Sequence, residues 1–229
     1  SIYGRIMHEL GCEERLAHTV PCRRDLMLEQ IARAVNETGG DGPVRIACLA
    51  SGPAREVEDF LRSYDGERRI EWTLIDQDAR ALSGANEQLL RAAAGKERRI
   101  KVKCLFTSFR QLANNPDLFE EVAGQDLLYS AGFFDYLPDD AAKQMAGLCV
   151  DMLRAGGRLL LGNAANERDV HWMPEFVLDW HMHYRDISEL RAVFPNDVVG
   201  LRPLTDTSNS WHFIEARRAT LSGAKGWGT

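Results

Sequence analysis

The chain has 229 residues, of which 45% are hydrophobic and 27% are charged, and its formal net charge is −6. These proportions are typical of a globular protein, and the length suits one large domain better than two small ones. The negative balance argues against a nucleic-acid partner, which needs an excess of Lys and Arg, and no apolar run approaches the ~20 residues that span a bilayer.

Five cysteines are scattered along the chain without a CxxC pair or a Cys/His group. This pattern favours neither a metal site nor a disulfide framework. The N-terminal stretch also lacks the apolar segment of a secretory signal. We therefore expect a cytoplasmic protein with no bound metal and no membrane partner.

The first forty residues have helical periodicity. We expect one short helix over Tyr3–Leu16 and a second over Arg23–Val35, which a Thr-Gly-Gly sequence ends. Residues 1–40 would then form a helical extension, acting either as a lid over a ligand or as a contact in a homodimer. The main domain would cover residues 41–219, and the Gly-rich residues 220–229 would form a disordered tail.

Strands and helices alternate from residue 44 onward. The expected strands are Val44–Ala50, Arg69–Asp76, Ile100–Phe106, Asp126–Ser130, Arg158–Gly162, Val198–Leu204 and Trp211–Ala216. The expected helices are Pro53–Tyr64, Gln77–Ala94, Pro138–Leu153 and a helical region over Val170–Phe194. This order predicts an α/β protein, a Rossmann-like, doubly wound seven-stranded sheet that ends in an antiparallel hairpin. Ligands of such sheets bind beyond the carboxyl ends of the strands.

The first predicted strand ends in a turn with a single glycine, Ala50-Ser51-Gly52-Pro53. Because Gly52 has no Cβ, a ligand can approach its backbone closely, and the next helix would direct free N–H groups at that ligand. A plain strand–helix turn is the competing interpretation.

The second predicted strand ends in an acid. Asp76 lies 24 positions after Gly52 and can accept hydrogen bonds from the two hydroxyl groups of a ribose, with Gln77 beside it. Asp76 and Asp78 both suit the cap of the helix that follows. Asp78 fits the cap at least as well, which leaves Asp76 for a ligand.

The third and fourth strand ends combine small polar residues with aromatic ones. These are Thr107, Ser108 and Phe109 after the third strand, and Ser130, Ala131, Gly132 and Tyr136 after the fourth. Phe109 could face an adenine ring, and Gly132 again permits close approach. Packing in the core is an equally good account of Phe109, Phe133 and Phe134.

The segment after the fifth strand supplies the candidates for the acceptor side. They are Asn163, His171, Trp172, Trp180, His183, Tyr184 and Arg185. On one continuous helix Trp172, Trp180 and His183 would lie near one face and could roof a pocket, although a core role competes. Arg185, or Arg23 or Arg24 of the N-terminal helix, could hold a carboxylate of either the acceptor or a cofactor.

Four segments resemble class I S-adenosylmethionine-dependent methyltransferases in their order and spacing: LASGPAREV, LIDQDARAL, YSAGFFDYLPDD and LRAGGRLLLGN. The resemblance implies S-adenosylmethionine as cofactor and S-adenosylhomocysteine as product, with Gly52 in the first motif, Asp76 on the ribose, and Ser108 and Phe109 at the adenine. The first motif departs from the usual E/D-x-G-x-G-x-G, because Ala50 and Pro53 stand in it.

A narrower resemblance, carried by SGPARE, IDQDARAL, AGFFDYL and DWHMHYR, is to bacterial proteins that make 3-hydroxypalmitic acid methyl ester. It implies methyl transfer to a small molecule, with the carboxylate of a fatty or other organic acid as acceptor. Two alternatives stay open. One is N- or O-methylation of an amine or hydroxyl metabolite with His171 or His183 as base, and the other is a non-catalytic domain that binds S-adenosylmethionine.

Overall fold

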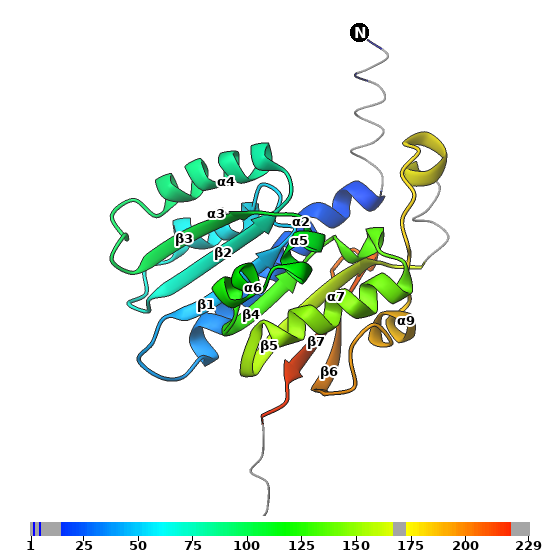
Figure 1. Cartoon of the computed structure of the whole chain (residues 1–229). Coiled ribbons are helices and arrows are strands. Elements are labelled where there is room, and N and C mark those ends of the chain that lie inside the picture. Colours follow the sequence, from blue (N-terminus) through cyan, green and yellow to red (C-terminus); the bar gives the residue numbers. More distant parts are fainter. Residues whose placement is uncertain (1, 3–4, 6–14, 167–172, 221–229) are drawn as a thin grey trace, which may run out of the picture.

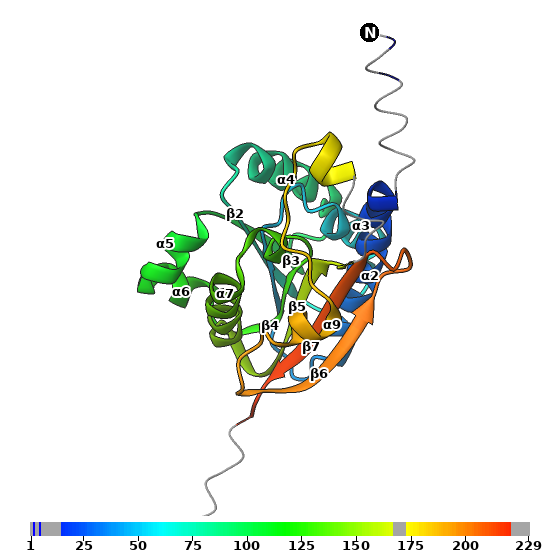
Figure 2. The same ribbon diagram turned by 90° about the vertical axis from the view of Figure 1, so that its right-hand side faces the viewer.

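The computed structural model describes residues 2, 5, 15–166 and 173–220. Its seven strands form one sheet in the order β3-β2-β1-β4-β5-β7-β6 (Figure 1). The strands are β1 Val44–Leu49, β2 Ile70–Asp76, β3 Ile100–Phe106, β4 Gln125–Ser130, β5 Leu153–Ala164, β6 Val198–Thr205 and β7 Trp211–Arg218. Strands β1 to β5 are parallel, and β7 pairs antiparallel with both β5 and β6 (Figure 2). The predicted fold class is confirmed.

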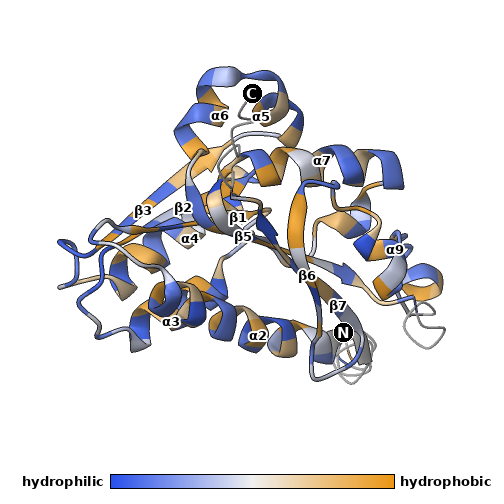
Figure 3. Cartoon of the chain, turned by 90° about the horizontal axis from the view of Figure 1, so that it is seen from below, coloured by the Kyte–Doolittle hydropathy of each residue, from blue (hydrophilic) through white to orange (hydrophobic). Residues whose placement is uncertain are grey.

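Helices cover both faces of the sheet. They are α2 Arg15–Glu37, α3 Arg55–Ser63, α4 Ala79–Ala92, α5 Phe109–Asn114, α6 Pro116–Val122, α7 Asp139–Asp151 and α9 Ile187–Arg191, with a 3-10 turn η1 at Phe134–Tyr136 and a π-helical turn η2 at Met173–Val177. Figure 3 shows α2 and α3 below the sheet and α5, α6 and α7 above it. No helix in the described part of the chain is long and apolar enough to cross a membrane.

The alternation of side chains along β1 explains the two layers. Ile46 and Cys48 face the core under α2, α3 and α4, whereas Ala47 and Leu49 face the core under α5, α6 and α7. A strand with both faces covered by helices has no polar face, which is why β1 is apolar in the sequence except for the exposed Arg45 near its amino end.

Helix α2 is longer than predicted and packs on the first of these cores through Met27 and Ile31, both buried. An ion network also ties it to the sheet: Arg33 Nη1 lies 2.8 Å from an oxygen of the buried Glu215. The predicted short helix over Tyr3–Leu16 falls almost entirely outside the described residues, as does the predicted tail.

The predicted helical region over Val170–Phe194 is helical only in two short pieces of its described part, η2 and α9, and is not one continuous helix. After η2 the chain has no helix over residues 178–186, and only α9 is helical between there and Phe194. Asp179 has a left-handed φ of 51°. The backbone then bonds to other elements: the N–H of His183 donates to Asp135 O at 2.6 Å, and that of Arg185 donates to Ala164 O at 3.0 Å. These tertiary bonds replace those of a helix, so the expected common helix face is not formed.

Candidate active site

The loop after β1 has a strained backbone. Ala50, Gly52 and Ala54 have φ values of 54°, 50° and 47°, which lie in the left-handed region. Alanine adopts this region at a cost of about 1 kcal/mol or more per residue. The three residues have the same alternate spacing as the glycines of E/D-x-G-x-G-x-G, so the alanines adopt backbone conformations that favour glycine. A Cβ added to Gly52 would meet no atom within 4 Å, so the backbone there faces open space.

Asp76 joins this loop to the end of β2. Its carboxylate accepts hydrogen bonds from the N–H of Gly52 at 2.7 Å and the N–H of Asp78 at 2.9 Å, one at each oxygen. The side chain is buried, and each oxygen keeps a second lone pair for a hydroxyl donor. Asp78 caps α4, as expected, by accepting from the N–H groups of Arg80 and Ala81. Asp76 therefore does not cap α4. It does hold the loop after β1 through the N–H of Gly52, a contact that the sequence did not predict.

Two cavities flank Asp76 at the carboxyl edge of the sheet. The first, of about 350 Å³, lies between α2, the loop after β1 and the end of β4, and it is lined by Ala50, Ser51, Gly52, Ala131 and Gly132 among others. The second, of about 590 Å³, lies between α5 and α7 and is lined by Gln77, Ser108 and Phe109 among others. Eight of the predicted cofactor residues therefore line one cavity or the other. Asp76, Thr107 and Ser130 are buried and line neither, but Gly52 and Gln77, on either side of Asp76, line the first and the second cavity.

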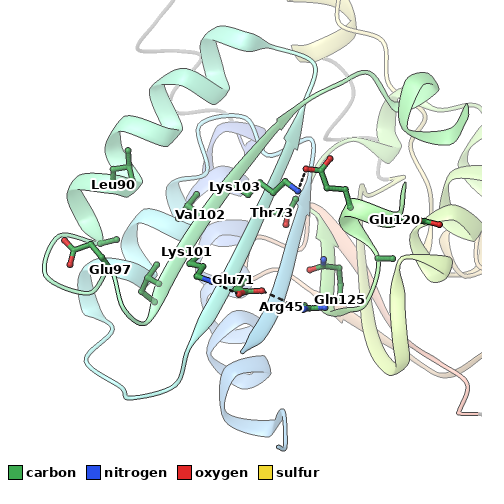
Figure 4. Close-up of a pocket in the computed structure, with 14 residues that line it drawn as sticks. Arg45, Glu71, Thr73, Leu90, Glu97, Lys101, Val102, Lys103, Glu120 and Gln125 are labelled. Atoms are coloured by element: carbon green, nitrogen blue, oxygen red, sulfur yellow. Dashed lines mark hydrogen bonds and ion pairs between the residues drawn. The ribbon is translucent and has the colours of Figure 1, made fainter. Parts of the chain in front are cut away.

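A larger hollow of about 700 Å³ lies at the opposite, amino ends of the strands (Figure 4). Five of its seven charged side chains pair with one another: Glu71 contacts Arg45 at 3.4 Å and Lys101 at 3.3 Å, and Lys103 pairs with Glu121. Arg45, Glu71 and Lys101 are register partners on adjacent strands. This hollow lies at the amino ends of the strands, whereas the ligand site was predicted at their carboxyl ends, so it is not the predicted site.

Arg23 brings a cation to the first cavity. Its guanidinium lies 3.9 Å from the centre of the Trp211 ring, and Nη1 donates to Ala131 O at 3.2 Å. Burial lowers the pKa of Arg23, and neighbouring acids oppose that effect. Its Nε is buried without a hydrogen-bond partner. Arg24 also lines the cavity but is more exposed and pairs with Asp59 at 3.4 Å.

Two buried acids near this cavity, Asp135 and Glu56, were not predicted from the sequence. Burial raises the pKa of Asp135 to about 7, and its Oδ1 accepts from the N–H of Ala164 at 2.7 Å. Glu56 lines the cavity from the first turn of α3, and burial raises its pKa too. Asp135 stands inside an aromatic run and Glu56 two positions into a helix, where a surface acid is the default expectation. An acid within an apolar run was the only available signal, and it applied to Asp135 alone.

Aromatic side chains gather at the same edge. The rings of Tyr136 and Trp180, both predicted to bind substrate, stack with centroids 6.4 Å apart and remain partly exposed. Phe109 packs on Phe133 with centroids 3.8 Å apart, which supports a core role, and it also lines the second cavity, so its contact with an adenine ring stays a prediction. Phe133 and Phe134 are buried core residues.

Arg185 has a structural position, contrary to its predicted role as a residue of the acceptor site that holds a carboxylate. Its side chain is 2% exposed, and all five N–H donors are used by protein acceptors. The acceptors are Asp139 Oδ1, reached from Nε and Nη2, Phe134 O and Asn163 Oδ1, reached from Nη1, and Leu137 O, reached from Nη2. No donor is left for a substrate carboxylate.

The other predicted acceptor-side residues also differ from expectation. Asn163 is fully buried, accepts from Arg185 and donates to His183 O at 2.8 Å, so it cannot bind substrate as predicted. His183 is exposed and does not share a helix face with Trp180. Burial raises the pKa of Tyr184 to about 12, which makes it a poor base at neutral pH. His171 and Trp172 lie outside the described residues.

Comparison with known proteins gives no match to a family model and no similar curated sequence. Solved structures do match. A possible exported protein from Bordetella parapertussis has a TM-score of 0.65 at 18% identity, covering 86% of this chain and 67% of that chain. Magnesium protoporphyrin IX methyltransferase ChlM from Synechocystis PCC 6803, with bound S-adenosylhomocysteine, has a TM-score of 0.61 at 9% identity, covering 86% and 84%. N-methyltransferase NodS from Bradyrhizobium japonicum WM9, also with S-adenosylhomocysteine, has a TM-score of 0.58 at 14% identity, covering 85% and 86%. At these identities the likeness shows a shared fold.

Proposed function

We propose that this chain is an S-adenosylmethionine-dependent methyltransferase that acts on a small-molecule acceptor. The observation that carries the proposal is the junction of Gly52 and Asp76 at the carboxyl edge, with open space at Gly52 and a cavity on each side. The bound S-adenosylhomocysteine in ChlM and NodS supports the cofactor, since both proteins have the same fold.

The residues present fit this cofactor. Its ribose hydroxyls would use the remaining lone pairs of Asp76, its adenine would lie in the second cavity by Ser108 and Phe109, and its amino-acid end would enter the first. Ser51 lines that first cavity, and its buried hydroxyl has no hydrogen-bond partner, as expected of a group that awaits a ligand. When bound, the cofactor supplies an electrophilic methyl group on a sulfonium.

A carboxylate is the preferred acceptor. Methyl transfer is an in-line displacement that depends mainly on alignment, and an ionised carboxylate needs no base. The exposed position of His183 agrees with a reaction that uses no histidine base. The more exposed cation Arg24 could attract the acid, and the stacked Tyr136 and Trp180 could contact an apolar chain. The narrower sequence resemblance also favours a methyl ester product.

Asp135 supports a second candidate, methylation of a hydroxyl or amine. A buried carboxyl with a pKa of about 7 can act as a general base near neutral pH, which His183 and Tyr184 are not placed to do. A non-catalytic domain that binds the cofactor is the remaining alternative.

Calorimetry with S-adenosylhomocysteine, followed by a methyl-release assay across carboxylic acids, alcohols and amines, tests the proposal. Binding together with turnover of carboxylic acids supports it in full. Turnover of alcohols or amines but not of carboxylic acids would show that the acceptor is a hydroxyl or amine. Binding of the cofactor without any turnover would support a non-catalytic domain. A folded protein that binds neither S-adenosylhomocysteine nor S-adenosylmethionine refutes the proposal.

A further inference from the structure

The first cavity carries opposite charges on facing elements. Arg23 lines it from α2, and Glu56 lines it from the first turn of α3, with Gly52 in the same wall. The two side chains interact electrostatically but form no ion pair with each other in the described structure. Charged groups that share a cavity without pairing leave room for a ligand that carries both signs.

We propose that Arg23 and Glu56 bind the two charged groups of the cofactor's amino-acid end, Arg23 its carboxylate and Glu56 its ammonium. The inference rests on the proposed function and adds the direction in which the cofactor lies. Its zwitterionic end would point toward α2, and its nucleoside end toward α5.

Arg23 is prepared for a planar anion. The Trp211 ring holds one face of its guanidinium at 3.9 Å, and the buried Nε has no partner. Gly132 provides the space, since a Cβ there would lie 2.8 Å from Arg23 Nη1. An oriented guanidinium with an unused donor matches the paired hydrogen bonds that a carboxylate accepts.

Glu56 has one oxygen engaged and one available. Its Oε1 accepts from the hydroxyl of Tyr129 at 2.7 Å and lies 3.9 Å from Cys48 Sγ, whereas Oε2 accepts from no other residue in the described part of the chain; the residue's own backbone N–H is the remaining donor to the carboxylate. Cys48 stands two residues before Ala50, at the place of the acid in E/D-x-G-x-G-x-G. Glu56 therefore brings to this place, from the helix, the carboxyl group that the strand lacks.

Stability measurements separate a binding role of Glu56 from a purely structural one, because a residue that only stabilises the fold should lower stability when it is replaced. Burial, the largest cause, raises its pKa in the folded protein. Between the unfolded and folded pKa values the unfolded chain gives up the proton that the folded protein keeps, so this group lowers stability as the pH rises. Glu56→Gln keeps an acceptor for Tyr129 and removes the ionisable group. It should leave the folded state at least as stable at pH 7, yet weaken binding of an ammonium.

The test compares two ligands by calorimetry: S-adenosylhomocysteine, and 5′-methylthioadenosine, which has the same thioether nucleoside without the amino-acid end. Wild type should prefer S-adenosylhomocysteine. Glu56→Gln and Arg23→Gln should each weaken S-adenosylhomocysteine by about 10- to 100-fold and change 5′-methylthioadenosine by less than about twofold. Glu58→Gln is the matched control, because Glu58 lies on the same helix, pairs with Arg55 and Arg62, and does not itself line the cavity. It should keep the wild-type preference.

Wild type that binds both ligands equally well would overturn this inference and leave the proposed function standing. Wild type that binds neither would overturn the proposed function itself. Should Arg23→Gln keep its affinity for S-adenosylhomocysteine and raise the acceptor's KM instead, Arg23 holds the acceptor and its assignment here is wrong. Loss of both ligands in Glu56→Gln would overturn the assignment of Glu56.

Discussion

Replacing Asp135 with Asn should stabilise the protein at neutral and alkaline pH and change it little near pH 4. The carboxyl is 1% exposed, and burial raises its pKa from 3.8 to about 7. Between these values the unfolded chain is ionised while the folded protein stays protonated, so the free energy of unfolding falls as the pH rises. About three pKa units at ~1.4 kcal/mol each give an upper value of about 4 kcal/mol, reached above pH 7. Asn keeps an acceptor for the N–H of Ala164 and avoids this cost.

Urea denaturation of wild type and Asp135→Asn from pH 4 to pH 9 measures the effect. The stability difference should be near zero at pH 4 and should grow in favour of the variant until about pH 7. Asp139→Asn is the control of opposite sign: the hydrogen bond from Arg185 lowers the pKa of Asp139, so its stabilisation is present at neutral pH and lost as the pH falls. Parallel curves for wild type and Asp135→Asn at every pH would refute the reasoning.

Three further changes test other parts of the structure. Ala50→Gly should relieve the left-handed strain and raise the free energy of unfolding by up to about 1 kcal/mol in urea denaturation, and a loss of stability would contradict the strain. Arg185→Met leaves buried acceptors unpaired and should cost more than about 3 kcal/mol, so a wild-type melting temperature would refute its structural role. Trp180→Ala should leave S-adenosylhomocysteine affinity unchanged in calorimetry and raise the acceptor's KM in steady-state assays by about 10-fold. An unchanged KM would remove Trp180 from the acceptor site.

The succession of strands along the chain was predictable, because each buried strand leaves a short apolar run between helical patterns. The length of β5 was not: the sequence indicates Arg158–Gly162, whereas the strand is Leu153–Ala164. Gly156-Gly157 resembles a helix stop followed by a turn, but Gly157 lies in the strand, where a Cβ would be 2.6 Å from Gln125 O. The region before α9 was misassigned because backbone bonds to distant elements outweigh local helical spacing.

Within the candidate site, the residues at strand ends were predictable. Gly52 and Asp76 follow buried strands directly, and topology alone brings adjacent strand ends together. Arg23, Glu56 and Asp135 gain their importance from burial and from neighbours far along the chain, which local patterns do not encode. Arg185 illustrates the reverse case, because a charged residue near histidines suggests chemistry while its surroundings make it structural.

The affinity of Asp76→Ala for S-adenosylhomocysteine, measured by calorimetry beside wild type, tests the central claim most directly. Losing the ribose hydrogen bonds should weaken binding by roughly 1.5–3 kcal/mol, or about 10- to 150-fold. Asp78→Ala removes the neighbouring helix cap instead and should bind like wild type, which controls for loosening of α4, and Asp76→Asn, which keeps one oxygen acceptor, should lose less affinity than Asp76→Ala. Wild type that binds no S-adenosylhomocysteine, or a folded Asp76→Ala that binds it as tightly as wild type, would contradict the account.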